Sequence, residues 1–331
     1  MSTPVAILQQ YWGYEQFRPL QEDIIKSILA GQDTLALLPT GGGKSVCFQV
    51  PALMKPGLCL VVTPLIALMK DQVANLKRKG ITAYAIYSGM PYQEVERVLE
   101  AARRGGCRFL YVSPERLRSK LFQTYCDGLP VNLIAVDEAH CISQWGYDFR
   151  PAYLQIADIR SFFPEAPVLA LTASATPKVQ ADICDKLLMK AAAVFTRSFA
   201  RPNLSYSVQE EVTKIDKVKH ILDRVPGSGI VYCRNRRRTK EIADLLQLQG
   251  IAASFYHAGL PQAERAARQE AWINNETRVM VCTNAFGMGI DKPDVRIVVH
   301  YDMPDGLEAY YQEAGRAGRD EVKAYAVLLY N

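Results

Sequence analysis

The stretch that decides the fold is TLALLPTGGGKS, residues 34–45. The run at 34–38 predicts a short buried strand, the glycines at 41–43 predict a tight turn, and Lys44 and Ser45 begin a helix. Backbone N–H groups of such a turn can approach a phosphate chain closely, and the helix N-terminus adds partial positive charge. The stretch therefore predicts an α/β fold with a phosphate site after its first strand.

The residue types in this turn indicate nucleotide binding. Lys44 is expected to reach the β- and γ-phosphates and Ser45 to ligate magnesium. The strict phosphate-loop pattern has glycine at position 38, where this chain has Leu38, so the loop is a variant. The alternative interpretation is a glycine-rich turn with a chance lysine. The predicted nucleotide contacts within the loop are Thr40, Gly41, Gly42, Gly43, Lys44 and Ser45.

A second apolar run, residues 133–136, ends in the carboxylates Asp137 and Glu138. At the carboxyl edge of a strand, Asp137 can hold magnesium largely through water, and Glu138 can position and deprotonate an attacking water. The alternative is a solvated strand edge. Together with the phosphate loop, the acid pair predicts phosphoryl transfer to water.

Apolar runs and helical patterns alternate along most of the chain, which predicts parallel sheets covered on both faces. The helices expected at 64–79 and 91–104 each end at a glycine. The pattern pauses at 197–206 and then restarts, so we expect two consecutive α/β domains, residues 1–198 and 199–331. The expected strands are 34–38, 59–63, 109–113, 133–136, 168–172, 229–233, 253–257, 279–283 and 295–301.

Composition narrows the class of protein. The chain has 331 residues, 49% of them hydrophobic, and a net charge of +5, which is globular and permits a polyanion partner without requiring one. No apolar run approaches the roughly 20 residues of a membrane span, and no basic secretory leader opens the chain. The eight cysteines form no C-x-x-C pair. We expect a soluble, intracellular protein of a reducing compartment, cytoplasm or nucleoid, with no membrane partner.

Residues 312–319, QEAGRAGR, contain two arginines three positions apart. We expect Arg316 and Arg319 to share one face of a short helix and to stabilise the charge that develops on the γ-phosphate. Surface charge is the alternative role of this pair.

Taken in order, these motifs resemble those of superfamily 2 helicases, and specifically the RecQ DNA helicases. Most specific is CISQWGYDFRP, residues 141–151, an aromatic-rich loop that separates RecQ proteins from RNA-directed DEAD and DEAH relatives. The other matching motifs are GYEQFRPLQ (13–21), PTGGGKS (39–45), TPLIALMKDQV (63–73), SPERL (113–117), DEAH (137–140), LTASATP (171–177), AFGMGIDKP (285–293) and QEAGRAGR (312–319).

The resemblance implies two tandem RecA-like domains, each a mainly parallel sheet flanked by helices. It implies that Tyr14 and Arg18 sandwich adenine while Gln21 reads the edge of the base, as stacking and amide pairing allow. It also assigns Gln312 and Asp291 to the nucleotide, Asp291 at the ribose. Tyr14 and Phe17 have core packing as their alternative role.

In the family the aromatic-rich loop senses single-stranded DNA and relays its presence to the ATPase site. Trp145 and Phe149 would supply stacking surfaces and Arg150 a cation, although one aromatic can instead merely pack the loop. Thr63, with Pro64, is expected to open a helix whose N–H groups face a phosphate. Thr283 and Asn284 are expected to act likewise from the second domain. The basic run 234–238 adds positive potential or is a solvated helix start.

The family resemblance implies an ATP- and Mg²⁺-dependent 3′-to-5′ DNA helicase acting on single-stranded DNA and on tailed or forked duplex DNA. RecQ proteins typically continue into a four-cysteine zinc-binding region and a winged helix. Since no cysteine follows Cys282, we expect no zinc site in this chain. The alternatives are a DNA-stimulated translocase or annealing factor that unwinds poorly without a duplex-gripping region, and a nucleotide-gated binding module.

Overall fold

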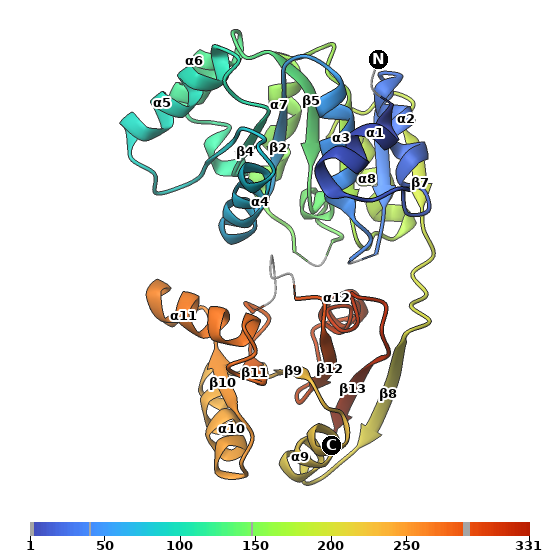
Figure 1. Cartoon of the computed structure of the whole chain (residues 1–331), viewed down its shortest axis with the longest axis vertical. Helices are drawn as coiled ribbons and strands as arrows, with labels where there is room; N and C mark the ends of the chain where they lie inside the picture. The colour runs from blue at the N-terminus through green and yellow to red at the C-terminus, as the bar shows by residue number, and fades with distance from the viewer. Residues whose placement is uncertain (1–2, 40, 147, 287–291) are drawn as a thin grey trace. The chain divides into compact units, whose positions relative to one another are not determined.

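The computed structural model describes residues 3–39, 41–146, 148–286 and 292–331. These residues form two compact units, Met1–Phe199 and Ala200–Asn331 (Figure 1). Each unit is built around one sheet with its own hydrophobic core.

The first unit contains a seven-stranded sheet in the order β3-β4-β2-β5-β6-β1-β7, with every paired strand parallel. Its strands are β1 (Thr34–Leu37), β2 (Leu58–Val62), β3 (Ala83–Ile86), β4 (Phe109–Val112), β5 (Val131–Val136), β6 (Val168–Thr172) and β7 (Ala193–Thr196). Its helices are α1 (Pro4–Trp12), α2 (Gln21–Leu29), α3 (Lys44–Met54), α4 (Ile66–Arg78), α5 (Tyr92–Arg103), α6 (Lys120–Cys126), α7 (Ile156–Arg160) and α8 (Pro177–Lys186), with 3₁₀ turns η1 (Pro114–Arg116), η2 (Ala139–Ile142) and η3 (Pro151–Gln155).

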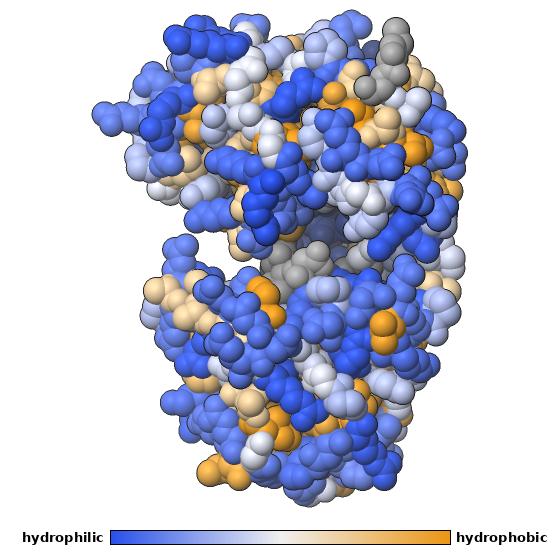
Figure 2. Space-filling view, in the orientation of Figure 1, coloured by the Kyte–Doolittle hydropathy of each residue, from blue (hydrophilic) through white to orange (hydrophobic). Residues whose placement is uncertain are grey.

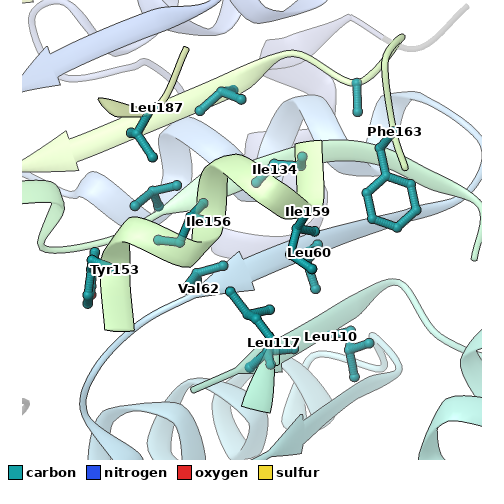
Figure 3. Close-up of a cluster of buried hydrophobic side chains, with 14 of the residues drawn as sticks. Leu60, Val62, Leu110, Leu117, Ile134, Tyr153, Ile156, Ile159, Phe163 and Leu187 are labelled. Atoms are coloured by element: carbon teal, nitrogen blue, oxygen red, sulfur yellow. The ribbon is translucent and has the colours of Figure 1, made fainter. Parts of the chain in front are cut away.

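Both faces of this sheet are buried, because alternate residues of one strand enter two different clusters. In β2, Leu60 and Val62 belong to the cluster that packs on α7, whereas Cys59 and Val61 belong to the cluster on the other face. Figure 3 shows the first of these clusters, with Ile156 and Ile159 of α7 lying over the strands. Double-sided burial explains why these strands are apolar throughout instead of alternating.

The second unit contains a six-stranded sheet in the order β10-β11-β9-β12-β13-β8, again parallel at every described pair. Its strands are β8 (Leu204–Glu210), β9 (Ser228–Tyr232), β10 (Ala253–Tyr256), β11 (Val279–Cys282), β12 (Val295–His300) and β13 (Ala324–Tyr330). Its helices are α9 (Lys214–Arg224), α10 (Arg236–Leu248), α11 (Gln262–Ile273) and α12 (Leu307–Ala314).

The predicted fold class, two parallel sheets flanked by helices, is confirmed. The nine expected strands are found within two residues of their predicted ends, but β3, β7, β8 and β13 were not predicted. Three of these four, β3, β7 and β8, are edge strands whose residues are only partly buried, unlike the fully buried strands at the centre of each sheet.

Two local predictions were wrong. The helix expected from Pro64 begins at Ile66, with Leu65 as its N-cap, so Thr63 and Pro64 lie before the helix instead of opening it. The helix expected to carry both arginines ends at Ala314, and Arg316 and Arg319 lie in the turns that follow. Gly315 and Gly318 favour a helix end and a turn there, since Gly318 has a φ of +62°.

The exposed faces in Figure 2 are mostly hydrophilic, with scattered hydrophobic residues on each unit. Among the described residues, no helix is long and apolar enough to cross a membrane.

Candidate nucleotide and nucleic-acid sites

The glycine loop between β1 and α3 is a backbone cradle. Gly41 and Gly43 have φ values of +80° and +75°, which residues with a side chain rarely adopt. A Cβ on Gly42 would lie 2.8 Å from the Pro39 carbonyl oxygen. Only glycine fits these positions, and α3 begins directly after them at Lys44. This is the geometry in which backbone N–H groups and a helix N-terminus receive a phosphate. Thr40 lies outside the described residues.

The segment at 13–21 is fastened to this loop by Gln21. The Gln21 Oε1 accepts from the Arg18 N–H at 2.9 Å, and its Nε2 donates to the carbonyls of Gly43 at 3.1 Å and Gly42 at 3.3 Å. The Arg18 guanidinium donates to the Gly41 carbonyl. Tyr14 is 59% exposed, so its ring is available for stacking. In this structure the side-chain amide of Gln21 is therefore hydrogen-bonded to the glycine loop.

Phe17 packs with the small cluster of Ile7, Ile25 and Val50, which confirms its alternative role as a core contact.

The acid pair lies at the carboxyl edge of the first sheet. The Asp137 N–H donates to the Val62 carbonyl at 2.9 Å, and the Glu138 N–H donates to Asp137 Oδ1 at 3.0 Å. Glu138 adopts a left-handed backbone with φ of +49°, which is strained for a residue with a side chain. Its Oε1 lies 4.0 Å from Lys44 Nζ. The strand order places β5 and the loop after β1 at one edge, because parallel strands end together.

Burial, and after it the neighbouring Glu138 charge, raise the pKa of the Asp137 carboxyl to about 6, while Lys44 acts in the opposite direction. Two carboxylates this close repel each other, so a cation is favoured between them and the phosphate loop. The donor set of a half-buried carboxylate and the Ser45 hydroxyl suits a hard cation such as Mg²⁺. Within the described ranges, no group of three or more His, Cys, Asp or Glu side chains forms a ready metal cage.

His140 joins the acid pair to β6, a contact that the sequence analysis missed. Its Nδ1 lies 2.9 Å from Thr172 Oγ1 and 3.4 Å from Glu138 Oε2. Burial lowers the pKa of the His140 imidazole, which keeps it neutral near pH 7. Thr172 belongs to the predicted motif 171–177, and only the adjacency of β5 and β6 brings it to His140.

Arg150 holds the aromatic-rich loop in place. The guanidinium of Arg150 pairs with Asp148 at 2.9 Å, and its Nη1 reaches the Pro64 carbonyl at 3.5 Å. Trp145 is 64% exposed, whereas Phe149 is partly buried. Of the three predicted residues, Trp145 therefore presents the largest free surface and Arg150 is engaged within the protein.

Three hydroxyls at the same edge lack a hydrogen-bond partner among the described residues, one of them Ser174 Oγ just after β6 and the other two nearly inaccessible to solvent. The other two are Thr63 Oγ1 and Ser113 Oγ, in residues that are 1% and 2% exposed. The Thr63 side chain is thus buried in this structure. Ser113 belongs to the motif 113–117, but the sequence analysis assigned it no role.

In the second unit, the turn that carries the arginines is held by two residues that the sequence analysis missed. Arg201 Nη2 donates to the carbonyls of Gly318 at 2.7 Å and Ala317 at 2.9 Å, and its Nη1 donates to Gly315 at 3.3 Å. Asn203 Nδ2 donates to the Gly318 carbonyl at 2.8 Å. Both residues lie in the stretch where the helical pattern pauses, and a polar pair flanking Pro202 is the signal that was available.

Arg316 is 9% exposed and hydrogen-bonds the Tyr232 hydroxyl, whereas Arg319 is partly buried. Burial raises the pKa of Tyr232, and the Arg316 charge partly offsets that rise. Gln312 is partly buried near the end of α12. Asp291 lies outside the described residues.

A pocket of about 290 Å³ lies at the carboxyl ends of β9 and β12. Asn284 lines it and is exposed, whereas Thr283 is buried with 7% exposure. His300, which also lines it, bonds Glu313 at 2.9 Å. The basic run 234–238 is largely neutralised by acidic neighbours, through the pairs Arg234–Asp305, Arg238–Asp302 and Arg237–Glu241.

Comparisons with known proteins show which families and relatives this chain resembles. The family described as "DEAD/DEAH box helicase" matches residues 18–183, and "Helicase conserved C-terminal domain" matches residues 213–321. "ATP-dependent DNA helicase RecQ" of Pasteurella multocida is 44% identical over 99% of this chain and 52% of its own length. "Probable ATP-dependent DNA helicase RecS" of Bacillus subtilis is 44% identical over 97% of this chain and 66% of its own length. The chain spans about half the length of the first of these relatives.

Solved structures share the fold. The "DUF1998 helicase MrfA bound to DNA" aligns with a TM-score of 0.82 at 17% identity, over all of this chain and 51% of that one. Saccharomyces cerevisiae Dbp5, bound to RNA, aligns with a TM-score of 0.78 at 18% identity, over all of this chain and 88% of that one. The family assignment rests on two findings. The DEAD/DEAH box helicase family matches half of the chain, and the Pasteurella multocida relative is 44% identical over nearly all of it. This chain belongs to the DEAD/DEAH box helicases and, within them, to the RecQ family.

Proposed function

We propose that this chain is an ATP-driven motor that moves 3′ to 5′ along single-stranded DNA and separates the strands of tailed or forked duplexes. The observation that carries the proposal is the approach of Lys44 and Glu138 to 4.0 Å beside a loop that only glycines can form. The DNA specificity rests on the curated relatives, which are named DNA helicases.

In this proposal the first domain, residues 1–198, binds and hydrolyses ATP. Lys44 neutralises the β- and γ-phosphates, and the N–H groups of the loop receive their oxygens. Glu138 Oε1 accepts a proton from the attacking water, and the strained backbone of Glu138 turns its carboxylate toward Lys44. His140, neutral and bonded to Thr172, restrains the Glu138 side chain.

Ser45 and Asp137 would hold magnesium, Asp137 largely through water. The ion supplies charge neutralisation on the phosphates when it is bound. The raised pKa of Asp137 supports this role. Burial disfavours the charged carboxylate, and a bound Mg²⁺ would compensate by stabilising that charge.

The remaining nucleotide contacts are proposed from the motifs. Tyr14 and Arg18 enclose adenine, and Gln21 reads its edge after exchanging its bonds with the phosphate loop. Gln312 contacts the nucleotide, and Arg316 and Arg319 of the second unit stabilise charge on the γ-phosphate. Thr40 and Asp291 are assigned by the motifs alone.

DNA contacts are proposed for two sets of residues. Trp145 stacks on bases, and Phe149 and Arg150 shape the loop that presents it. Phosphate contacts come from Thr63 in the first unit and from Thr283 and Asn284 in the second.

The test combines an ATPase assay with two duplexes of one sequence, one with a 3′ tail and one with a 5′ tail. DNA-stimulated hydrolysis and unwinding of the 3′-tailed duplex alone are expected. Hydrolysis without unwinding, repeated at low salt where phosphate contacts are strongest, would indicate a translocase or annealing factor. Absence of DNA-stimulated hydrolysis would leave a nucleotide-gated binding module.

A further inference from the structure

One face of α8 contacts the aromatic-rich loop through three polar side chains spaced four residues apart. Positions 178, 182 and 186 lie on the same side of a helix. The Lys178 ammonium lies 3.1 Å from the centroid of the Trp145 ring. Lys186 Nζ lies 3.4 Å from the Ile142 carbonyl and 2.9 Å from Asp182 Oδ2. None of these contacts is evident from the motifs, because η3, α7 and β6 lie between the loop and α8 in the sequence.

The ring of Trp145 contacts this face, and its backbone is tied to a residue beside it. The Trp145 N–H donates to Ser143 Oγ at 3.2 Å, and Ser143 is one of the groups that lower the pKa of Asp182. Partial burial alone would raise the pKa of Asp182, but the Ser143 and Lys186 bonds lower it below its ordinary value. Asp182 therefore stays ionised and keeps its pair with Lys186 across the neutral range.

The position of Lys178 on its helix argues that the ring contact matters. Lys178 stands in the first turn of α8, which contains no acidic residue, and the positive end of the helix dipole disfavours a cation there. A ring face attracts a cation and offsets that repulsion. Trp145 nevertheless keeps 64% of its surface exposed, so the lysine leaves area for a second stacking partner.

We propose that the α8 face formed by Lys178, Asp182 and Lys186 is a positioning device for Trp145. It holds the indole with one ring face against the Lys178 ammonium while the remaining surface receives a base of single-stranded DNA. The inference rests on the proposed function, since it takes Trp145 as the DNA-contacting residue.

The first test measures the DNA concentration that half-maximally stimulates ATP hydrolysis. Lys178→Ala is expected to raise it roughly two- to fivefold with unchanged basal hydrolysis, which is the range of an exposed cation–ring contact. Lys178→Arg is expected to restore it, because a guanidinium also stacks on a ring. Lys323→Ala is the matched control, since Lys323 lies 5.8 Å from the Tyr325 ring in the second unit and its loss removes the same charge.

A double-mutant cycle separates positioning from direct DNA contact. In a Trp145→Ala background, Lys178→Ala is expected to add nothing further. If Lys178 binds a DNA phosphate itself, its effect persists in that background and the salt slope of DNA affinity falls by about one. That result would overturn the proposal.

A readout without DNA tests the device alone. Acrylamide quenching of the Trp145 emission, taken as the difference between the protein and its Trp145→Phe variant, is expected to increase in Lys178→Ala. Unchanged quenching overturns the positioning device. Increased quenching with no change in DNA stimulation supports the device and instead overturns the proposed DNA role of Trp145.

Discussion

At the scale of single residues, the acid pair shows how much a strand end depends on its neighbours. Asp137 and Glu138 are adjacent in the chain, yet they have different surroundings. Asp137 has a backbone bond to β2 and a raised pKa, whereas Glu138 has a strained backbone with Lys44 and His140 beside its carboxylate. The different surroundings suit the two to different tasks, metal binding and proton transfer.

Glu138→Gln is expected to lower the rate of ATP hydrolysis about 10²- to 10⁴-fold, because an amide cannot take the proton of the attacking water. ATP binding should remain, since Lys44 and the glycine loop are unchanged. Lys44→Ala should instead weaken nucleotide binding. Steady-state hydrolysis and binding of a fluorescent ATP analogue measure the two effects, and normal turnover by Glu138→Gln would refute its role as the base.

Asp137→Asn is expected to stabilise the protein when magnesium and nucleotide are withheld. A carboxyl whose folded pKa of about 6 exceeds its unfolded value weakens the fold as the pH rises from about 4 to 6, and the loss is complete above that range. The gain from the amide should be roughly 1–3 kcal/mol at pH 8 and shrink as the pH is lowered toward 4. Thermal denaturation in EDTA at several pH values measures it, and an equal gain at every pH would contradict the assignment.

At the scale of elements, the candidate functional turns are held by residues from segments that are distant in the sequence. The stretch before β8 supplies Arg201 and Asn203, which satisfy the carbonyls of the turn at 315–318. In the first unit, α8 does the same for the loop after the acid pair. In both cases the supporting residues are distant in sequence from the turn that they hold. The patterns that predict helices and strands do not predict these contacts.

Arg201→Ala is expected to destabilise the protein by roughly 1–3 kcal/mol, because the turn carbonyls lose their donors. ATP hydrolysis should fall as well, since Arg316 and Arg319 lie in or beside this turn. Chemical denaturation and ATPase rates give the two readouts. Arg237→Ala is the control, because its exposed pair with Glu241 should contribute less than about 1 kcal/mol. A variant as stable and active as this control would contradict the role of Arg201.

At the scale of the whole molecule, the phosphate loop and the arginine turn belong to different compact units. Each unit buries its own sheet on both faces, and among the described residues the clusters of each unit contain residues of that unit alone. A hydrolysis site that required residues of both units would make turnover dependent on how they move, which is how a nucleotide can drive motion.

Arg319→Ala is therefore expected to preserve ATP binding while lowering hydrolysis about 10³-fold. Loss of unwinding should follow the loss of hydrolysis. Nucleotide titration and DNA-stimulated turnover of the same preparation separate the two effects. Equal loss of binding and turnover, or loss of neither, would count against a role in hydrolysis.

The sequence by itself determined the class of fold, the phosphate loop, the acid pair and the family, because each depends on residues that are consecutive or regularly spaced. A buried apolar run, then three glycines and a lysine, predicts a strand, a tight turn and a helix start. The tertiary structure alone decided the contacts of Gln21 with the loop, of His140 with Thr172, of α8 with Trp145 and of Arg201 with the arginine turn. His140 meets Thr172 because the parallel strands β5 and β6 end at a common edge, whereas Arg201 meets Gly318 because β8 and β13 begin side by side. The order of strands in each sheet is set by packing over the whole unit.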